Sequence, residues 1–142
     1  MPTRLPTLLA CLLFATGLSA GDTTDLSFSE AWSPEAPPGR TMAGFVTIRN
    51  SGDRDIELVA GNSPQFARVE FHTMSMNEGM MRMRRLETLI VPAGETVELA
   101  PRGLHLMLFE PRQRLTAGDT IEIELIDAGG ERHAYSAEVR QR

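Results

Sequence analysis

The chain has 142 residues, a single cysteine and a formal net charge of −5 at neutral pH. All of its basic residues are arginines, and the acidic residues outnumber them by 19 to 14. This charge balance does not indicate a protein that binds nucleic acid or an anionic membrane surface. A chain of this length can form one domain around its own hydrophobic core, and a single cysteine cannot form an intramolecular disulfide bond.

The N-terminal segment has the pattern of a secretory signal peptide. Arg4 supplies a positive charge, residues 5–18 form an apolar run, and small residues follow up to Ala20. The run is shorter than the ~20 residues that a membrane span requires. We expect cleavage after Ala20, which leaves residues 21–142 as an exported domain with no cysteine and no second apolar stretch of spanning length.

A lipoprotein processing site is the alternative interpretation of this segment. Residues 8–11, which end at Cys11, loosely resemble such a site. The apolar run continues past Cys11 to Phe14, however, and cleavage before the cysteine would leave a very short apolar segment. The pattern therefore favours an ordinary signal peptide.

The pattern of residues 21–142 predicts short strands separated by turns. In residues 121–125, isoleucine and leucine alternate with glutamate, which places apolar and charged side chains on opposite faces of a strand. The breaks are rich in Gly, Pro, Asn and Asp, and no long segment has a helical period. The pattern predicts an all-β domain, a β-sandwich or a Greek-key barrel. The predicted strands are residues 26–32, 43–49, 56–60, 67–74, 80–85, 87–91, 96–99, 104–109, 120–126 and 132–139.

Methionine and histidine gather in two segments of the chain. The first follows His72 and contains five methionines within ten residues. These are Met74, Met76, Met80, Met81 and Met83. In the second segment, His105 and Met107 alternate with three leucines, so a strand would place the two side chains together on the face that points away from the core.

A methionine most often fills a gap in a core, and a lone histidine is usually a surface or hydrogen-bonded residue. Residues 74–85 differ, because charged and polar side chains separate the methionines, as in an exposed loop. Exposed methionines are costly in an exported protein, since they oxidise to sulfoxides. Two histidines that each lie near methionine therefore indicate a metal site. His133 has no methionine two residues away, and we interpret it as a surface strand residue that is not a ligand.

The ligand types indicate which metal would bind. Thioether sulfur is soft and imidazole is borderline, which favours Cu(I) over magnesium, calcium or zinc. Thioethers cannot form disulfides in an oxidising compartment and need no deprotonation before they bind. A blue-copper electron-transfer centre requires a cysteine ligand, which residues 21–142 lack.

Four of these residues have a distinctive spacing. Ten residues separate His72 from Met83, twenty-one separate Met83 from His105, and one separates His105 from Met107. This spacing resembles the motif of the periplasmic CuA chaperone (PCuAC) family. Further segments look like family segments in family order. They are residues 31–32, 37–39, 47–52, 69–72, 79–84, 92–94, 96–99 and 105–108. Residues 101–104 depart from the family pattern, which more often has a Gly-Gly pair and an aromatic residue before the histidine.

The resemblance implies a cupredoxin-like Greek-key β-sandwich or barrel that binds one Cu(I) through His72, Met83, His105 and Met107. It also implies a periplasmic metallochaperone that delivers copper to the copper-site subunit of cytochrome c oxidase. A periplasmic thiol reductase or a copper donor would be a further partner.

Two other functions fit the same residues: a periplasmic copper buffer that serves resistance, and a metal-free β-sandwich interaction module. Copper stoichiometry would separate the module from the two copper proteins, and an oxidase-assembly phenotype would separate the chaperone from the buffer. We do not expect an enzyme, because the sequence contains neither a nucleophile-elbow pattern nor a phosphate-binding glycine motif.

Overall fold

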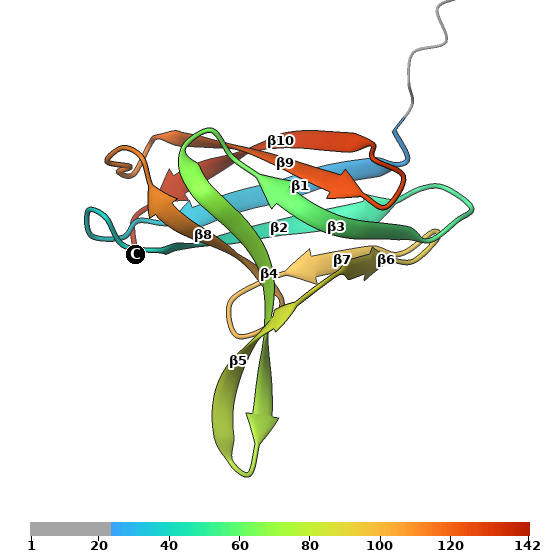
Figure 1. The fold of residues 1–142 in the computed structure, drawn as a ribbon, viewed down its shortest axis with the longest axis horizontal. Coiled ribbons are helices and arrows are strands. Elements are labelled where there is room, and N and C mark those ends of the chain that lie inside the picture. Colours follow the sequence, from blue (N-terminus) through green and yellow to red (C-terminus); the bar gives the residue numbers. More distant parts are fainter. Residues whose placement is uncertain (1–23) are drawn as a thin grey trace, which may run out of the picture.

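The computed structural model describes residues 24–142, so the predicted signal peptide and the alternative lipidation site at Cys11 lie outside the described residues. Each of the ten predicted strands is found, with ends that differ by a few residues (Figure 1). The strands are β1 (Leu26–Pro34), β2 (Met42–Asn50), β3 (Ile56–Asn62), β4 (Phe66–Asn77), β5 (Met80–Leu86), β6 (Leu89–Val91), β7 (Thr96–Leu99), β8 (His105–Pro111), β9 (Thr120–Asp127) and β10 (Arg132–Arg140). Within the described range no helix is long and apolar enough to cross a membrane.

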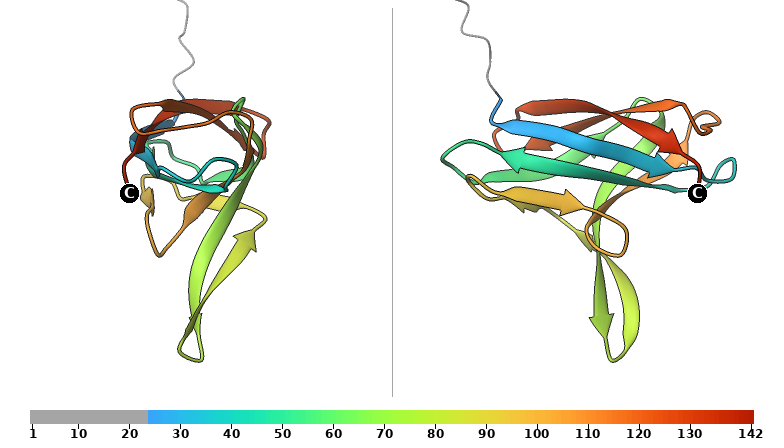
Figure 2. Two further views of the ribbon diagram at one scale, coloured as in Figure 1. Left: turned by 90° about the vertical axis from the view of Figure 1, so that its left-hand side faces the viewer. Right: turned by 180° about the vertical axis from the view of Figure 1, so that it is seen from behind.

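Seven strands close into a barrel, in the hydrogen-bonded order β4-β8-β2-β1-β10-β9-β3, with β3 returning to β4. β1 and β10 run parallel, whereas the other neighbours in this circuit are antiparallel. The remaining strands attach to the barrel: β5 pairs with β4, β6 with β3 and β7 with β2 (Figures 1 and 2). The prediction of a single all-β domain is confirmed, and of the two predicted architectures, sandwich and barrel, the structure has the barrel.

The core is built from the inward-facing residues of strands along which buried and exposed residues alternate. Ile121, Ile123 and Leu125 of β9 are fully buried, as the alternation predicts, and so are Leu106 and Leu108 of β8. Burying an aliphatic side chain of this size stabilises the fold by about 1.5–3 kcal/mol. A shift of one residue along β8 would expose its leucines, so the core fixes the face on which the residues between them lie.

The barrel closes where β3 meets β4, with Gly61 opposite Val69. A Cβ atom on Gly61 would lie 2.8 Å from Cγ1 of Val69, closer than two such carbons approach. Glycine therefore allows the two backbones to meet at this point. The closure fixes the position of β4, the strand that carries His72.

β4 and β5 continue beyond the barrel as a two-stranded hairpin (Figures 1 and 2). β4 pairs with β8 only as far as His72, and beyond that residue it pairs with β5 alone. The turn residues Glu78 and Gly79 have φ angles of 51° and 78°, which is typical of a two-residue type I′ turn. The exposure expected for residues 74–85 is thus found, and the segment is a regular hairpin whose second strand corresponds to the predicted strand at residues 80–85.

Candidate metal site

The two histidines of the predicted site lie directly opposite each other. The register of β4 and β8 pairs His72 with His105 and Glu70 with Met107. Opposite residues of antiparallel strands project from the same face of the sheet, and the centroids of the two imidazole rings are 5.9 Å apart. His72 and His105 therefore lie side by side on directly neighbouring strands.

β5 brings Met83 to this face. Met83 lies opposite Met74, which follows His72 by two residues on β4. Met74, Met83, His105 and Met107 line one pocket of about 360 Å³. Three of the four predicted ligands therefore share a pocket, while the His72 ring lies beside it. Met74, which was not among the predicted ligands, supplies a further thioether.

His105 is held in one tautomer. Its Nδ1–H donates to the carbonyl oxygen of Gly103 at 2.9 Å, and since a carbonyl oxygen can only accept, the proton lies on Nδ1. Nε2 keeps its lone pair for a metal, an arrangement common among histidine ligands. The side chain lies on the predicted face, away from the leucines, but it is not exposed there: His105 is only 6% exposed.

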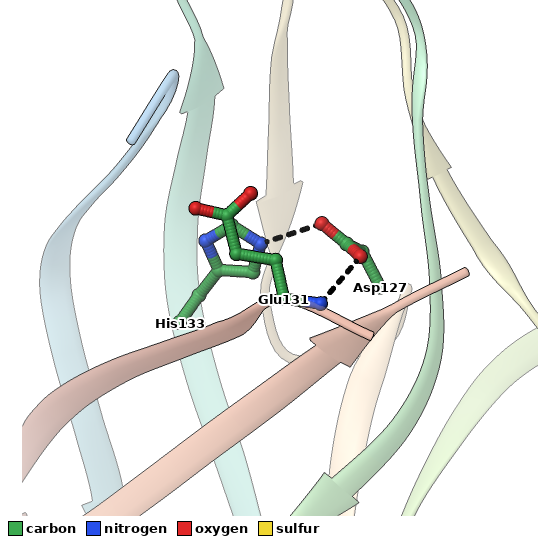
Figure 3. Close-up of side chains that lie close together, drawn as sticks. All are labelled: Asp127, Glu131 and His133. Atoms are coloured by element: carbon green, nitrogen blue, oxygen red, sulfur yellow. Dashed lines mark hydrogen bonds and ion pairs between the residues drawn. The ribbon is translucent and has the colours of Figure 1, made fainter. Parts of the chain in front are cut away.

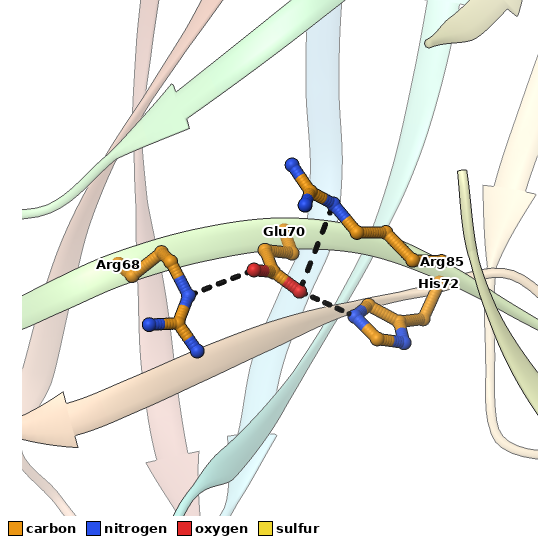
Figure 4. Close-up of polar contacts among 4 residues, drawn as sticks. All are labelled: Arg68, Glu70, His72 and Arg85. Carbon is orange, nitrogen blue, oxygen red and sulfur yellow. Dashed lines mark hydrogen bonds and ion pairs between the residues drawn. The ribbon is translucent and has the colours of Figure 1, made fainter. Parts of the chain in front are cut away.

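A carboxylate holds the other histidine. The Nε2–H of His72 donates to Oε2 of Glu70 at 2.9 Å, and the Nε–H of Arg68 donates to Oε1 at 2.7 Å, with Arg85 near the same carboxylate (Figure 4). The hydrogen bond from His72 lowers the pKa of Glu70, burial opposes this, and the two arginines add to the lowering, so the carboxyl stays ionised. Nδ1 of His72 is buried without a hydrogen-bond partner. It is therefore the nitrogen left to bind a metal.

A second cluster lies at the turn between β9 and β10 (Figure 3). Ligand-type atoms of Asp127, Glu131 and His133 lie within 4.8 Å of one another. Asp127 accepts hydrogen bonds from the backbone N–H groups of Gly129 and Glu131 at 2.9 and 3.0 Å, and from Nε2–H of His133 at 3.0 Å. These contacts organise the turn, and the cluster has no sulfur donor for Cu(I).

The interpretation of His133 as a surface residue is wrong, because its side chain is only 2% exposed. It lies opposite Leu125, in the row of β10 that faces the core together with Ala137 and Val139. The carboxylate of Asp127 accepts from Nε2–H of the buried ring, so one of its two nitrogens is satisfied, whereas Nδ1 is buried without a hydrogen-bond partner.

Comparison with known proteins places the chain in a family. The family model of LpqE-like putative lipoproteins matches residues 16–139. The chain belongs to this family. Putative lipoprotein Lxx21020 of Leifsonia xyli subsp. xyli is 30% identical over 133 residues, which cover 86% of this chain and 80% of that protein. The uncharacterized protein RP573 of Rickettsia prowazekii is 27% identical over 82 residues, which cover 57% of this chain and 45% of that protein.

Solved structures of PCuAC domains share the fold of this LpqE-like chain. The Cu(I)-bound form of DR1885 from Deinococcus radiodurans is 28% identical, with a TM-score of 0.65, and the match covers 89% of this chain and 84% of that one. The copper-bound PCuAC domain of PmoF2 has a TM-score of 0.69 at 21% identity, over 83% of this chain and 94% of that domain. The resemblance to the PCuAC family and the cupredoxin-like fold are confirmed.

Proposed function

We propose that this LpqE-like protein carries one Cu(I) ion between His72, Met83, His105 and Met107. The observation that supports the proposal best is the strand register, which brings residues from three strands onto one face. Two imidazoles and two thioethers are a donor set that suits Cu(I). The similarity to DR1885, whose solved form is Cu(I)-bound, supports the same metal.

The exposure of the site suits a carrier rather than an enzyme. Met83 is 50% exposed, so the ligands of a partner can reach a copper ion bound to it. The pocket of about 360 Å³ is much larger than a single ion and leaves room for a partner's side chain beside it. Transfer by ligand exchange needs this access, because the accepting ligands bind before the donating ligands leave.

We further propose that the protein acts in the periplasm and delivers copper to the copper-site subunit of cytochrome c oxidase. The description of the family as lipoproteins supports export, whether the segment before residue 24 is cleaved after Ala20 or lipidated at Cys11. On β5 the exposed Arg85 lies opposite His72, on the face of the site, whereas the exposed Arg82 and Arg84 lie on the other face of the hairpin. These three arginines make the hairpin basic, so a partner that docks against it should be acidic. A thiol reductase or a copper donor would be a second partner.

Metal analysis of purified residues 21–142 tests the first proposal. We expect one tightly bound Cu(I) and an X-ray absorption spectrum with both sulfur and nitrogen neighbours. A spectrum with only nitrogen and oxygen neighbours would contradict the ligand set. A protein that binds no copper would instead be a metal-free interaction module.

Deletion of the gene tests the second proposal. We expect loss of cytochrome c oxidase assembly that added copper restores, and transfer of Cu(I) from the purified protein to the isolated apo copper-site subunit. Normal oxidase together with increased sensitivity to copper would identify a copper buffer.

A further inference from the structure

The hairpin carries more methionines than the proposed site uses. Beyond His72, the register of β4 and β5 places Met74 opposite Met83 and Met76 opposite Met81. Because opposite residues share a face and residues two apart on a strand share a face, these four side chains form two successive pairs on one face of the hairpin. We call Met76 and Met81 the outer pair, and Met74 and Met83 the inner pair.

The two pairs lead from solvent to the pocket. The outer pair is 66% and 44% exposed near the hairpin turn, while the inner pair lines the pocket beside His105 and Met107. The type I′ turn fixes the register, so the pairing is specified by the sequence of the turn. Neither methionine of the outer pair contributes to the barrel core, and so core packing does not account for them.

The spacing of the outer pair suits a soft metal ion. Cβ atoms of directly opposite residues are about 4.5–5.5 Å apart, and methionine is long and flexible enough for two sulfurs to converge on one ion. Thioethers select Cu(I), and unlike imidazoles they bind no competing proton. With two thioethers and no imidazole, this pair should hold copper more weakly than the pocket does.

We infer that the outer pair is a second, weaker Cu(I) site from which copper passes along the inner pair into the pocket. In this step the bonds from copper to Met76 and Met81 break as bonds to Met74 and Met83 form. Copper remains Cu(I) throughout, and no proton or electron is transferred. The inference rests on the proposed copper-carrying function and adds an entry route to it.

The double variant Met76→Leu/Met81→Leu tests the inference, with Met80→Leu as the matched control. Met80 is 60% exposed on the same hairpin, but it lies opposite Asn77, on the other face. Titration with Cu(I) should show that the double variant loses the second, weaker equivalent and keeps the affinity of the first, while the control keeps both. Stopped-flow loading from the coloured Cu(I)–bicinchoninate complex should be slower for the double variant only.

Three results would overturn the inference. A second equivalent that survives in the double variant would exclude the outer site, and equal losses in the double variant and in Met80→Leu would exclude the face-specific pairing. An unchanged loading rate would exclude transfer along the hairpin. The variant His105→Ala separates this inference from the proposed function: it should lose the tight site but keep a weak Cu(I) with sulfur neighbours alone. Loss of both in that variant would contradict an independent outer site.

Discussion

Replacing Glu70 tests whether His72 is positioned for copper by its carboxylate partner. The hydrogen bond of 2.9 Å from Nε2–H fixes the imidazole ring and directs the free lone pair to Nδ1. Loss of a partner of this kind typically lowers metal affinity by about 10–100-fold, or about 1.4–2.7 kcal/mol. We expect Glu70→Ala to lose affinity in this range. Glu70→Gln should lose less, because its amide oxygen can still accept from Nε2–H.

Competition against a Cu(I)-selective chelator at neutral pH would measure these affinities. Glu124→Ala is the control, since it removes another glutamate–arginine pair, in which Arg132 donates to Glu124 at 2.6 Å. This pair lies on β9 and β10, which pair with neither β4 nor β8, the strands of His72 and His105. Its affinity should equal that of the wild type. The reasoning is refuted if Glu70→Ala also keeps the wild-type affinity, and equal losses in both alanine variants would point to a general effect of lost ion pairs.

The other predictions concern the remaining ligands and the second histidine cluster. Met83→Leu and Met107→Leu should weaken Cu(I) binding. They should change the unfolding free energy by less than about 1.5 kcal/mol, because leucine is close to methionine in volume. A large loss of unfolding free energy in denaturant titrations would mean that these methionines are core residues. His105→Ala should abolish tight Cu(I) binding, whereas His133→Ala should keep it and lower the stability of the fold, since the His133 ring is buried. Equal Cu(I) affinities of the two variants in chelator competition would contradict the assignment of His105 as a ligand. Burial raises the pKa of Asp127, but hydrogen bonds from His133 and from two backbone N–H groups outweigh it, so the folded-state pKa lies below the usual value. Its contribution to stability should thus be present above the unfolded-state pKa of about 3.9 and be lost as the pH falls through the folded-state value. An acid-denaturation profile that is the same for Asp127→Asn and the wild type would refute this.

Local patterns in the sequence were sufficient to predict the strands. Most strands alternate or carry β-formers, and the breaks contain turn residues, so these strands could be placed without knowledge of their partners. β5 does neither, and it is delimited by the turn at Glu78 and Gly79. The leucines that alternate with His105 and Met107 also determine the face of β8, because only one register buries them. The ligand set came from spacing and family resemblance, and the strand register now supports it independently.

The residues around the ligands could not be predicted, since alternation gives the face of a side chain but not what surrounds it. Glu70 lies beside His72 because residues two apart share a face, yet only the structure shows that its carboxylate bonds to the ring. His105 is buried although its face points away from the leucines. Both results depend on contacts between strands distant in sequence, which follow from the closure of the barrel.

The sequence contains a signal for the burial of His133. His133, Ala137 and Val139 alternate along one strand, and the two aliphatic residues indicate that their face is the inner one. The absence of a nearby methionine bears on copper binding and not on burial. Asp127, six residues earlier, is the partner that permits a buried imidazole here, and a short turn between the two residues was a signal for it.

The hairpin shows why this fold can combine a stable barrel with the exposed soft-metal site that we propose. The core is complete without the outer part of β4 and β5, since no residue from 73 to 85 belongs to the buried cluster. Side chains there are free of the packing constraints that exclude polar or oxidisable residues from a core. The pairing of β4 with β8 nevertheless anchors the base of the hairpin at His72 and His105. The proposed ligands on the hairpin can therefore be exposed to a partner while the barrel holds the imidazoles in place, which is the arrangement that the proposed copper transfer by ligand exchange requires.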